Sequence, residues 1–236
     1  TAHDRTAVER FVRPPAAVEA PRAQTLDDLV ARRAAFLIDY QDAAYANRYR
    51  ALVDKTRAAE APFGSTRLAE AVARNYFKLL AIKDEYEVAR LHADPAFHAK
   101  IATTFEGDYQ LNFHLAPPLM AKADPATGRP LKRAYGPWML TALRWLAKLK
   151  FLRGGAFDVF GKTAERRLER ALVADYERDI ADALTRLNSS NLDTAVALAS
   201  LPEQIRGFGH IKLRAIEAAR ERRAALLAKL GGAAGT

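Results

Sequence analysis

Apolar residues recur every three or four positions from Leu26 to about residue 60, and again from about residue 66 to Leu91. This period is typical of amphipathic helices. Thr25 suits the N-cap of the first helix, Pro62-Phe63-Gly64-Ser65 interrupts the pattern, and Ser65 or Thr66 would cap the second. The first helix would have about thirty residues and a length of about 45 Å. Two such helices joined by a short turn predict a long helical hairpin.

The middle of the chain changes its periodicity. Asp94 and Pro95 suit the start of a short helix that ends near Gly107. Residues 109–115 then alternate between apolar and polar, which indicates a strand. Residues 131–135 would pair with that strand as a small, irregular antiparallel β-ribbon.

Helical periodicity returns after the ribbon. It predicts a helix from Gly136 to about Gly154 and an amphipathic helix over about 163–187. A short helix to Leu201, capped by Asn191 or Ser190, and a last helix ending near Leu230 would follow. The pattern therefore predicts a mainly α, multi-helix domain into which the β-ribbon is inserted.

The ends differ from the centre in composition. Residues 1–24 include Pro14-Pro15 and begin with Thr rather than Met, so we expect a linker from a preceding catalytic domain of a longer polypeptide. Residues 25–230 would form the helical domain, with a sub-boundary near 107–136. The small residues of 231–236 predict a disordered tail.

Composition narrows the function classes. The 236-residue chain has a net charge of +9 but alternates its basic residues with acidic ones, which favours solvated helix faces over nucleic-acid binding. It has no cysteine, so thiolate chemistry and cysteine-ligated clusters are excluded within these residues. No apolar run is long enough to span a membrane. We expect a cytoplasmic protein with no membrane partner.

Candidate chemistry is sparse. His92 and His98 are six residues apart with Pro95 between them, which does not match the spacing of metal ligands on one helix. The G-x-G of residues 206–210 lacks the third glycine of a dinucleotide-binding loop. We therefore predict no catalytic residue, metal site or cofactor site in this segment. An alternative is an anion or coenzyme A contact lined by Arg206, His210 and Lys212.

Several stretches, in order along the chain, resemble the C-terminal region of fused indolepyruvate ferredoxin oxidoreductases, in the 2-oxoacid:ferredoxin oxidoreductase family. The matching segments are FLIDYQDAAY (36–45), KDEYEVARL (83–91), FEGDY (105–109), LNFHLAPP (111–118), YGPWML (135–140), TAERR (163–167) and LPEQIRGFGH (201–210). In that family the region is a domain of unknown function.

The resemblance implies a parent enzyme that oxidatively decarboxylates aryl pyruvates with thiamine diphosphate, Mg²⁺ and iron–sulfur clusters, and passes electrons to ferredoxin. None of the residues for that chemistry is present here, so no catalytic role is carried over. We expect a structural or assembly domain that contacts the catalytic domains of the same polypeptide in a homodimer. Candidate interface residues are Tyr109, Phe113, His114, Tyr135 and Trp138. A coenzyme A or anion-contacting module and a basic nucleic-acid-binding domain remain the alternatives.

Overall fold

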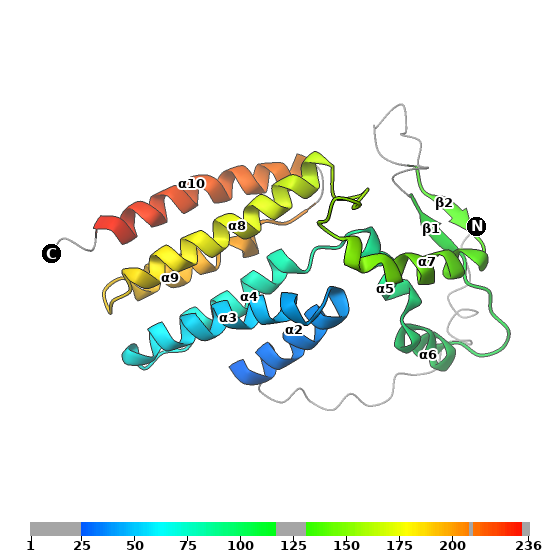
Figure 1. Cartoon of the computed structure of the whole chain (residues 1–236), viewed down its shortest axis with the longest axis horizontal. Helices are drawn as coiled ribbons and strands as arrows, with labels where there is room; N and C mark the ends of the chain where they lie inside the picture. The colour runs from blue at the N-terminus through cyan, green and yellow to red at the C-terminus, as the bar shows by residue number, and fades with distance from the viewer. Residues whose placement is uncertain (1–24, 117–130, 208–209, 233–236) are drawn as a thin grey trace, which may run out of the picture. The chain divides into compact units, whose positions relative to one another are not determined.

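The computed structural model describes residues 25–116, 131–207 and 210–232. Over these residues the chain forms nine α-helices, three short 3₁₀-helices and one two-stranded sheet (Figure 1), so the prediction of a mainly helical fold is confirmed. The predicted linker, residues 1–24, lies outside the described residues. Among the described residues, no helix is both long and apolar enough to cross a membrane.

The chain divides into two compact units, and one is inserted into the other. The inserted unit comprises Lys83–Phe160, and the bundle comprises Ala23–Ile82 together with Gly161–Thr236. The chain therefore changes unit at 82/83 and at 160/161, and the range 107–136 of the predicted sub-boundary falls in the inserted unit.

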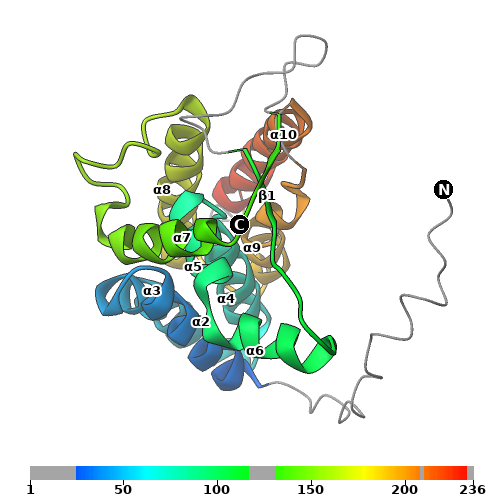
Figure 2. The ribbon, with the colours of Figure 1, turned by 90° about the vertical axis from the view of Figure 1, so that its right-hand side faces the viewer.

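The bundle is organised around one central helix, α4. Its elements are α2 (Leu26–Tyr40), α3 (Ala43–Glu60), η1 (Ala61–Phe63), α4 (Arg67–Leu80), α8 (Ala164–Thr185), α9 (Leu192–Ala199), η3 (Leu201–Gln204) and α10 (His210–Gly232). Helix α4 contacts α2 and α3 on one side and α8 and α9 on the other, as Figures 1 and 2 show. The core of the bundle thus joins segments that are far apart in sequence.

The predicted thirty-residue first helix is wrong, because the chain breaks at Gln41–Asp42 and forms α2 and α3 instead. Asp42 is the N-cap of α3, and its carboxylate accepts a hydrogen bond of 2.7 Å from the Tyr45 amide. The N-cap predicted at Thr25 is confirmed, since its hydroxyl accepts a hydrogen bond from the Asp28 amide, and the Asp28 carboxylate completes a capping box by accepting from the Thr25 amide. The hairpin is therefore made by α3 and α4, joined by η1.

The second predicted helix is also broken. Helix α4 ends at Leu80, and α5 (Glu85–Ala93) begins after Asp84, whose carboxylate accepts a hydrogen bond of 2.8 Å from the Glu87 amide. This break coincides with the passage of the chain from the bundle into the inserted unit. Both breaks occur at aspartates that cap a helix within a continuous apolar period.

The inserted unit is built on the packing of α5 against α7 (Trp138–Lys148). Its other elements are α6 (Pro95–Thr104), β1 (Phe113–Leu115), β2 (Arg133–Tyr135) and η2 (Leu149–Leu152). The strands pair antiparallel, with Phe113 opposite Tyr135, so the predicted ribbon is confirmed but shorter than expected. Ala89, Phe113, Met139 and Leu143 form the small core of this unit.

The C-terminal helices agree with the pattern in their main features. Helix α8 covers most of the predicted 163–187, and Thr163 is its N-cap, whose hydroxyl accepts a hydrogen bond from the Arg166 amide. Helix α10 continues to Gly232, so the prediction of a disordered tail is wrong for residues 231–232. The remainder of that predicted tail, 233–236, lies outside the described residues.

Candidate functional site

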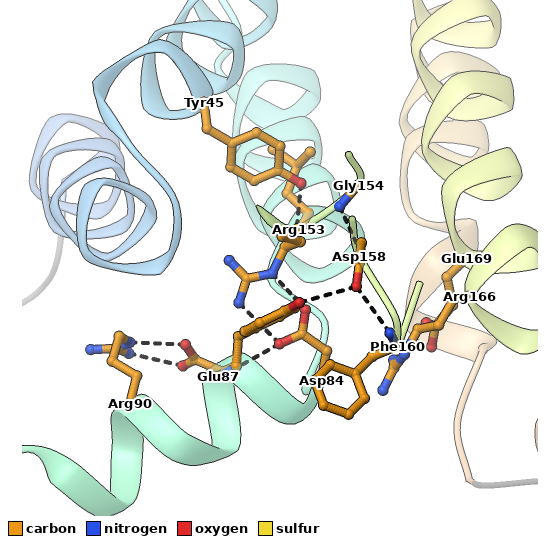
Figure 3. Close-up of polar contacts among 12 residues, drawn as sticks. Tyr45, Asp84, Glu87, Arg90, Arg153, Gly154, Asp158, Phe160, Arg166 and Glu169 are labelled. Atoms are coloured by element: carbon orange, nitrogen blue, oxygen red, sulfur yellow. Dashed lines mark hydrogen bonds and ion pairs between the residues drawn. The ribbon is translucent and has the colours of Figure 1, made fainter. Parts of the chain in front are cut away.

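A cluster of charged side chains lies at the N-terminus of α5 in the inserted unit (Figure 3). The Arg153 guanidinium donates hydrogen bonds of 2.5 and 2.9 Å to the two carboxylate oxygens of Asp84. The carboxylate of Asp158 accepts hydrogen bonds from the amides of Gly154 and Phe160 and from the hydroxyl of Tyr86. Both aspartates are almost fully buried. Each therefore already has hydrogen-bond donors for its oxygens.

Tyr86 lies at the centre of this cluster. Its ring lies under the Arg153 guanidinium, whose central carbon is 5.5 Å from the ring centroid, and it packs edge-to-face against Phe160. Burial, followed by the neighbouring carboxylate of Asp158, raises the pKa of Tyr86 to about 12. A phenol with this pKa stays protonated at neutral pH and donates to Asp158. The arrangement ties η2 and the following loop to α5 and offers no acid–base pair.

The bundle contains two further carboxylates with internal roles. Glu60 is fully buried and accepts hydrogen bonds of 2.8 and 2.9 Å from the amides of Leu68 and Ala69, in the first turn of α4. Glu177 accepts two hydrogen bonds from Arg48 and one from the hydroxyl of Tyr76. Partial burial alone would raise the pKa of Glu177, but the bonds from Arg48 and Tyr76 outweigh it and lower that pKa.

The cysteine-ligated iron–sulfur clusters that the resemblance implies for a parent enzyme have no ligands in this chain. The sequence has no cysteine to ligate an iron–sulfur cluster. In the described part of the chain, no three His, Asp or Glu side chains are grouped so that they could hold a metal ion.

Two of the three residues of the alternative anion site have described side chains, and both have acceptors within the bundle. The ammonium group of Lys212 forms ion pairs with Glu169 and, at 3.8 Å, with Glu165. Arg206 is exposed, and its Nε donates a hydrogen bond of 2.9 Å to the carbonyl oxygen of Glu203. The side chain of His210 lies outside what the structure describes.

The five candidate interface residues have different environments. Phe113 is only 5% exposed and packs in the core of the inserted unit, 5.5 Å between ring centroids from His92. Trp138 is 60% exposed and contacts the half-buried Tyr135 edge-to-face. Tyr109 and His114 are exposed as well. Four of the five thus have side chains that a partner could reach.

Sequence reasoning missed the larger surface to which Trp138 belongs. Helix α7 buries Met139 and Leu143, yet Trp138 and Trp145, seven residues apart, stand on a second face with exposures of 60% and 66%. We use the name α7 surface for the exposed apolar residues of α7 and of the segment that follows it as far as Val159: Trp138, Trp145, Leu149, Phe151, Phe157 and Val159. The spacing of seven between the two tryptophans, offset from the Met139–Leu143 stripe, was the available signal.

The α7 surface is also basic. Lys132, Arg133, Arg144 and Lys148 are exposed, and the ammonium of Lys148 lies 4.8 Å from the centroid of a Trp145 ring. Asp158 is the only acidic residue in 131–160, and it is buried. This stretch therefore presents aromatic and cationic groups to solvent without an exposed carboxylate.

Comparison with known proteins identifies the family to which this chain belongs. The fold over the described residues defines a mainly helical domain with one small two-stranded sheet. Residues 26–225 match the model of a family of unknown function, DUF6537, and the chain belongs to that family. No curated protein and no solved structure matches the chain.

Proposed function

We propose that this chain is a non-catalytic docking domain of a larger polypeptide of the indolepyruvate ferredoxin oxidoreductase type. The observation that carries the proposal is the α7 surface, where large aromatic side chains and cations are exposed together. The buried aspartates of the inserted unit, Asp84 and Asp158, are engaged in internal hydrogen bonds. The ordered sequence stretches that resemble that enzyme family support the choice of parent.

The chemistry of the α7 surface indicates its partner. Tryptophan and arginine are enriched where binding energy concentrates in protein interfaces, and phenylalanine is enriched in interface cores. Cations around such a patch favour a partner surface that is apolar at its centre and acidic at its rim. We assign that partner to the catalytic domains of the same polypeptide, in a homodimeric parent.

In this proposal the cofactors belong to the rest of the parent. Thiamine diphosphate, Mg²⁺ and the iron–sulfur clusters would be held by the catalytic domains, and ferredoxin would accept electrons from those domains. The present chain would order the catalytic domains or complete the dimer. It supplies no thiolate to the chemistry, since it has no cysteine.

The test is complementation of a truncated parent. The catalytic polypeptide lacking this chain is mixed with the separate 236-residue chain, and binding is measured by sedimentation velocity. Indolepyruvate-dependent reduction of ferredoxin is measured on the same samples. The variant W145S/F151S removes two side chains that are 66% and 68% exposed. The matched control is I211S, which removes a 56% exposed side chain from the bundle.

We expect the wild-type chain and I211S to bind and to restore activity, and W145S/F151S to bind at least roughly tenfold more weakly, as loss of two interface anchors implies. A truncated parent that is fully assembled and active without this chain would refute the proposal. Retention of the chain on DNA that falls steeply with salt, with no binding to the catalytic polypeptide, would favour a nucleic-acid-binding function instead.

A further inference from the structure

A cavity of about 220 Å³ lies within the bundle, between α8, α9, η3 and α10. Helices α8 and α10 run side by side and parallel (Figure 1). Glu169 of α8 pairs with Lys212 of α10, and further along both helices Asp179 pairs with Arg223. The wall of the cavity is mainly aliphatic, with Leu172 from α8 as one member. Ion pairs therefore join the two helices at two positions, and side chains do not fill the space between the helices in this region.

Protein interiors rarely leave a space of this size empty, because packing is as dense as in organic crystals. An aliphatic cavity of about 150 Å³ is sufficient to bind benzene in another protein. Leu198 of α9, Leu201 of η3, and Ile216 and Ala219 of α10 are buried side chains in the wall. The cavity can therefore hold the apolar body of a small molecule.

The charged residues that line the cavity differ in whether they have an ion-pair partner. Asp179 pairs with Arg223, and Asp175 pairs with Arg178 at 3.1 Å. Tyr176 donates its hydroxyl to the Ala199 carbonyl at 2.9 Å, so its hydroxyl hydrogen is already used. Arg220 also lines the cavity, is exposed at its mouth, and has no ion-pair partner among the described residues.

We propose that this cavity binds a small amphipathic carboxylate. The apolar body would lie between α8 and α10, against Ile216 and Ala219, and the carboxylate would accept hydrogen bonds from the Arg220 guanidinium. Ile216, Ala219, Arg220 and Arg223 follow one face of α10 at spacings of three and four residues, so one helix face supplies both the apolar contact and the cation. A guanidinium matches the geometry of a carboxylate through two parallel hydrogen bonds.

The test uses two probes of the same length, octanoate and octanol, with the 236-residue chain. Binding is measured by isothermal titration calorimetry and by chemical-shift changes of the Ile216 and Leu198 methyl groups. R220Q removes the cation at the mouth of the cavity. R222Q is the matched control, because Arg222 is exposed on α10 and does not line the cavity. A219L fills the apolar space, and far-UV circular dichroism reports whether each variant is folded.

We expect wild type and R222Q to bind octanoate about fivefold more tightly than octanol, as an exposed ion pair of about 1 kcal/mol implies. R220Q should lose this preference and still bind octanol, and folded A219L should bind neither. Absence of binding by wild type, equal affinity of wild type for the two probes, or an unchanged octanoate preference in R220Q would overturn the proposal. If A219L is not folded, the comparison of R220Q with R222Q alone decides.

Discussion

Glu60 offers the most direct test of the internal architecture. Its carboxylate is 0% exposed and accepts hydrogen bonds of 2.8 and 2.9 Å from the Leu68 and Ala69 amides. These amides lie in the first turn of α4, where backbone donors have no partner within the helix. Of the residues at the expected cap, the Ser65 hydroxyl accepts a hydrogen bond of 3.2 Å from the Arg67 amide, and the Thr66 side chain makes no capping hydrogen bond. Glu60 therefore remains the acceptor for the Leu68 and Ala69 amides.

The substitution Glu60→Gln keeps the size of the side chain and one acceptor oxygen. One buried amide then faces an NH₂ group instead of an oxygen, at a cost of about 1–3 kcal/mol. Loss of the negative charge at the helix N-terminus destabilises the bundle by about 0.3–1 kcal/mol more, the size of one helix-dipole interaction. Removal of a buried charge offsets part of this destabilisation, because the charge no longer has to be kept out of water. We expect a net destabilisation of the bundle by about 2 kcal/mol.

The matched control is Glu70→Gln, in the first turn of the same helix. Glu70 forms a 3.9 Å ion pair with Arg74, and both side chains are substantially exposed. Such pairs contribute about 0–1 kcal/mol, so the control should change the free energy of unfolding by about 0.5 kcal/mol. Urea unfolding followed by far-UV circular dichroism measures both variants. Equal free energies of unfolding for the two variants, within about 0.5 kcal/mol, would refute the capping role of Glu60.

Three further predictions concern other parts of the chain. Arg153→Met leaves the buried carboxylate of Asp84 without its guanidinium and should destabilise the inserted unit by about 3–5 kcal/mol, measured by urea unfolding followed by the fluorescence of the α7 tryptophans; unchanged stability would contradict the pairing. Burial raises the pKa of Tyr49 to about 12 from an ordinary 10, so the folded state holds a proton that the unfolded state loses. Stability should fall between about pH 10 and 12 and fall less in Tyr49→Phe; an identical decline in both proteins would count against this cause. Gly207 has φ +93°, and an added Cβ would lie 2.7 Å from Ile211 Cγ2. Gly207→Ala should therefore lower the free energy of unfolding by about 1–3 kcal/mol. An unchanged thermal unfolding transition would argue against this geometry.

The sequence predicted the features that depend on neighbouring residues. Thr25 and Asp94 cap their helices as expected, because capping is a contact between residues only two or three positions apart. The same reasoning missed Asp42 and Asp84, where a cap interrupts an apolar period that continues on both sides. Periodicity alone cannot distinguish one long helix from two short helices that bury the same stripe.

The candidate site was less predictable because its contacts are long-range. Asp84 and Arg153 pair across 69 positions, and Glu60 caps a helix other than its own. Phe113 and Trp138 are both aromatic residues near turns, yet one is buried and the other exposed. Their environments follow from how α5 packs on α7, which no local pattern contains.

The insertion of residues 83–160 into the bundle affects how the protein is made on the ribosome. Helix α4 emerges early, but its partners α8 and α9 are synthesised only after the whole inserted unit. Domains fold as units during synthesis, at about 5–20 residues per second, so the apolar side of α4 waits for several seconds or longer. During that interval the apolar side of α4 lacks the helices that cover it in the folded bundle. The inserted unit, contiguous in sequence, can complete its own core first.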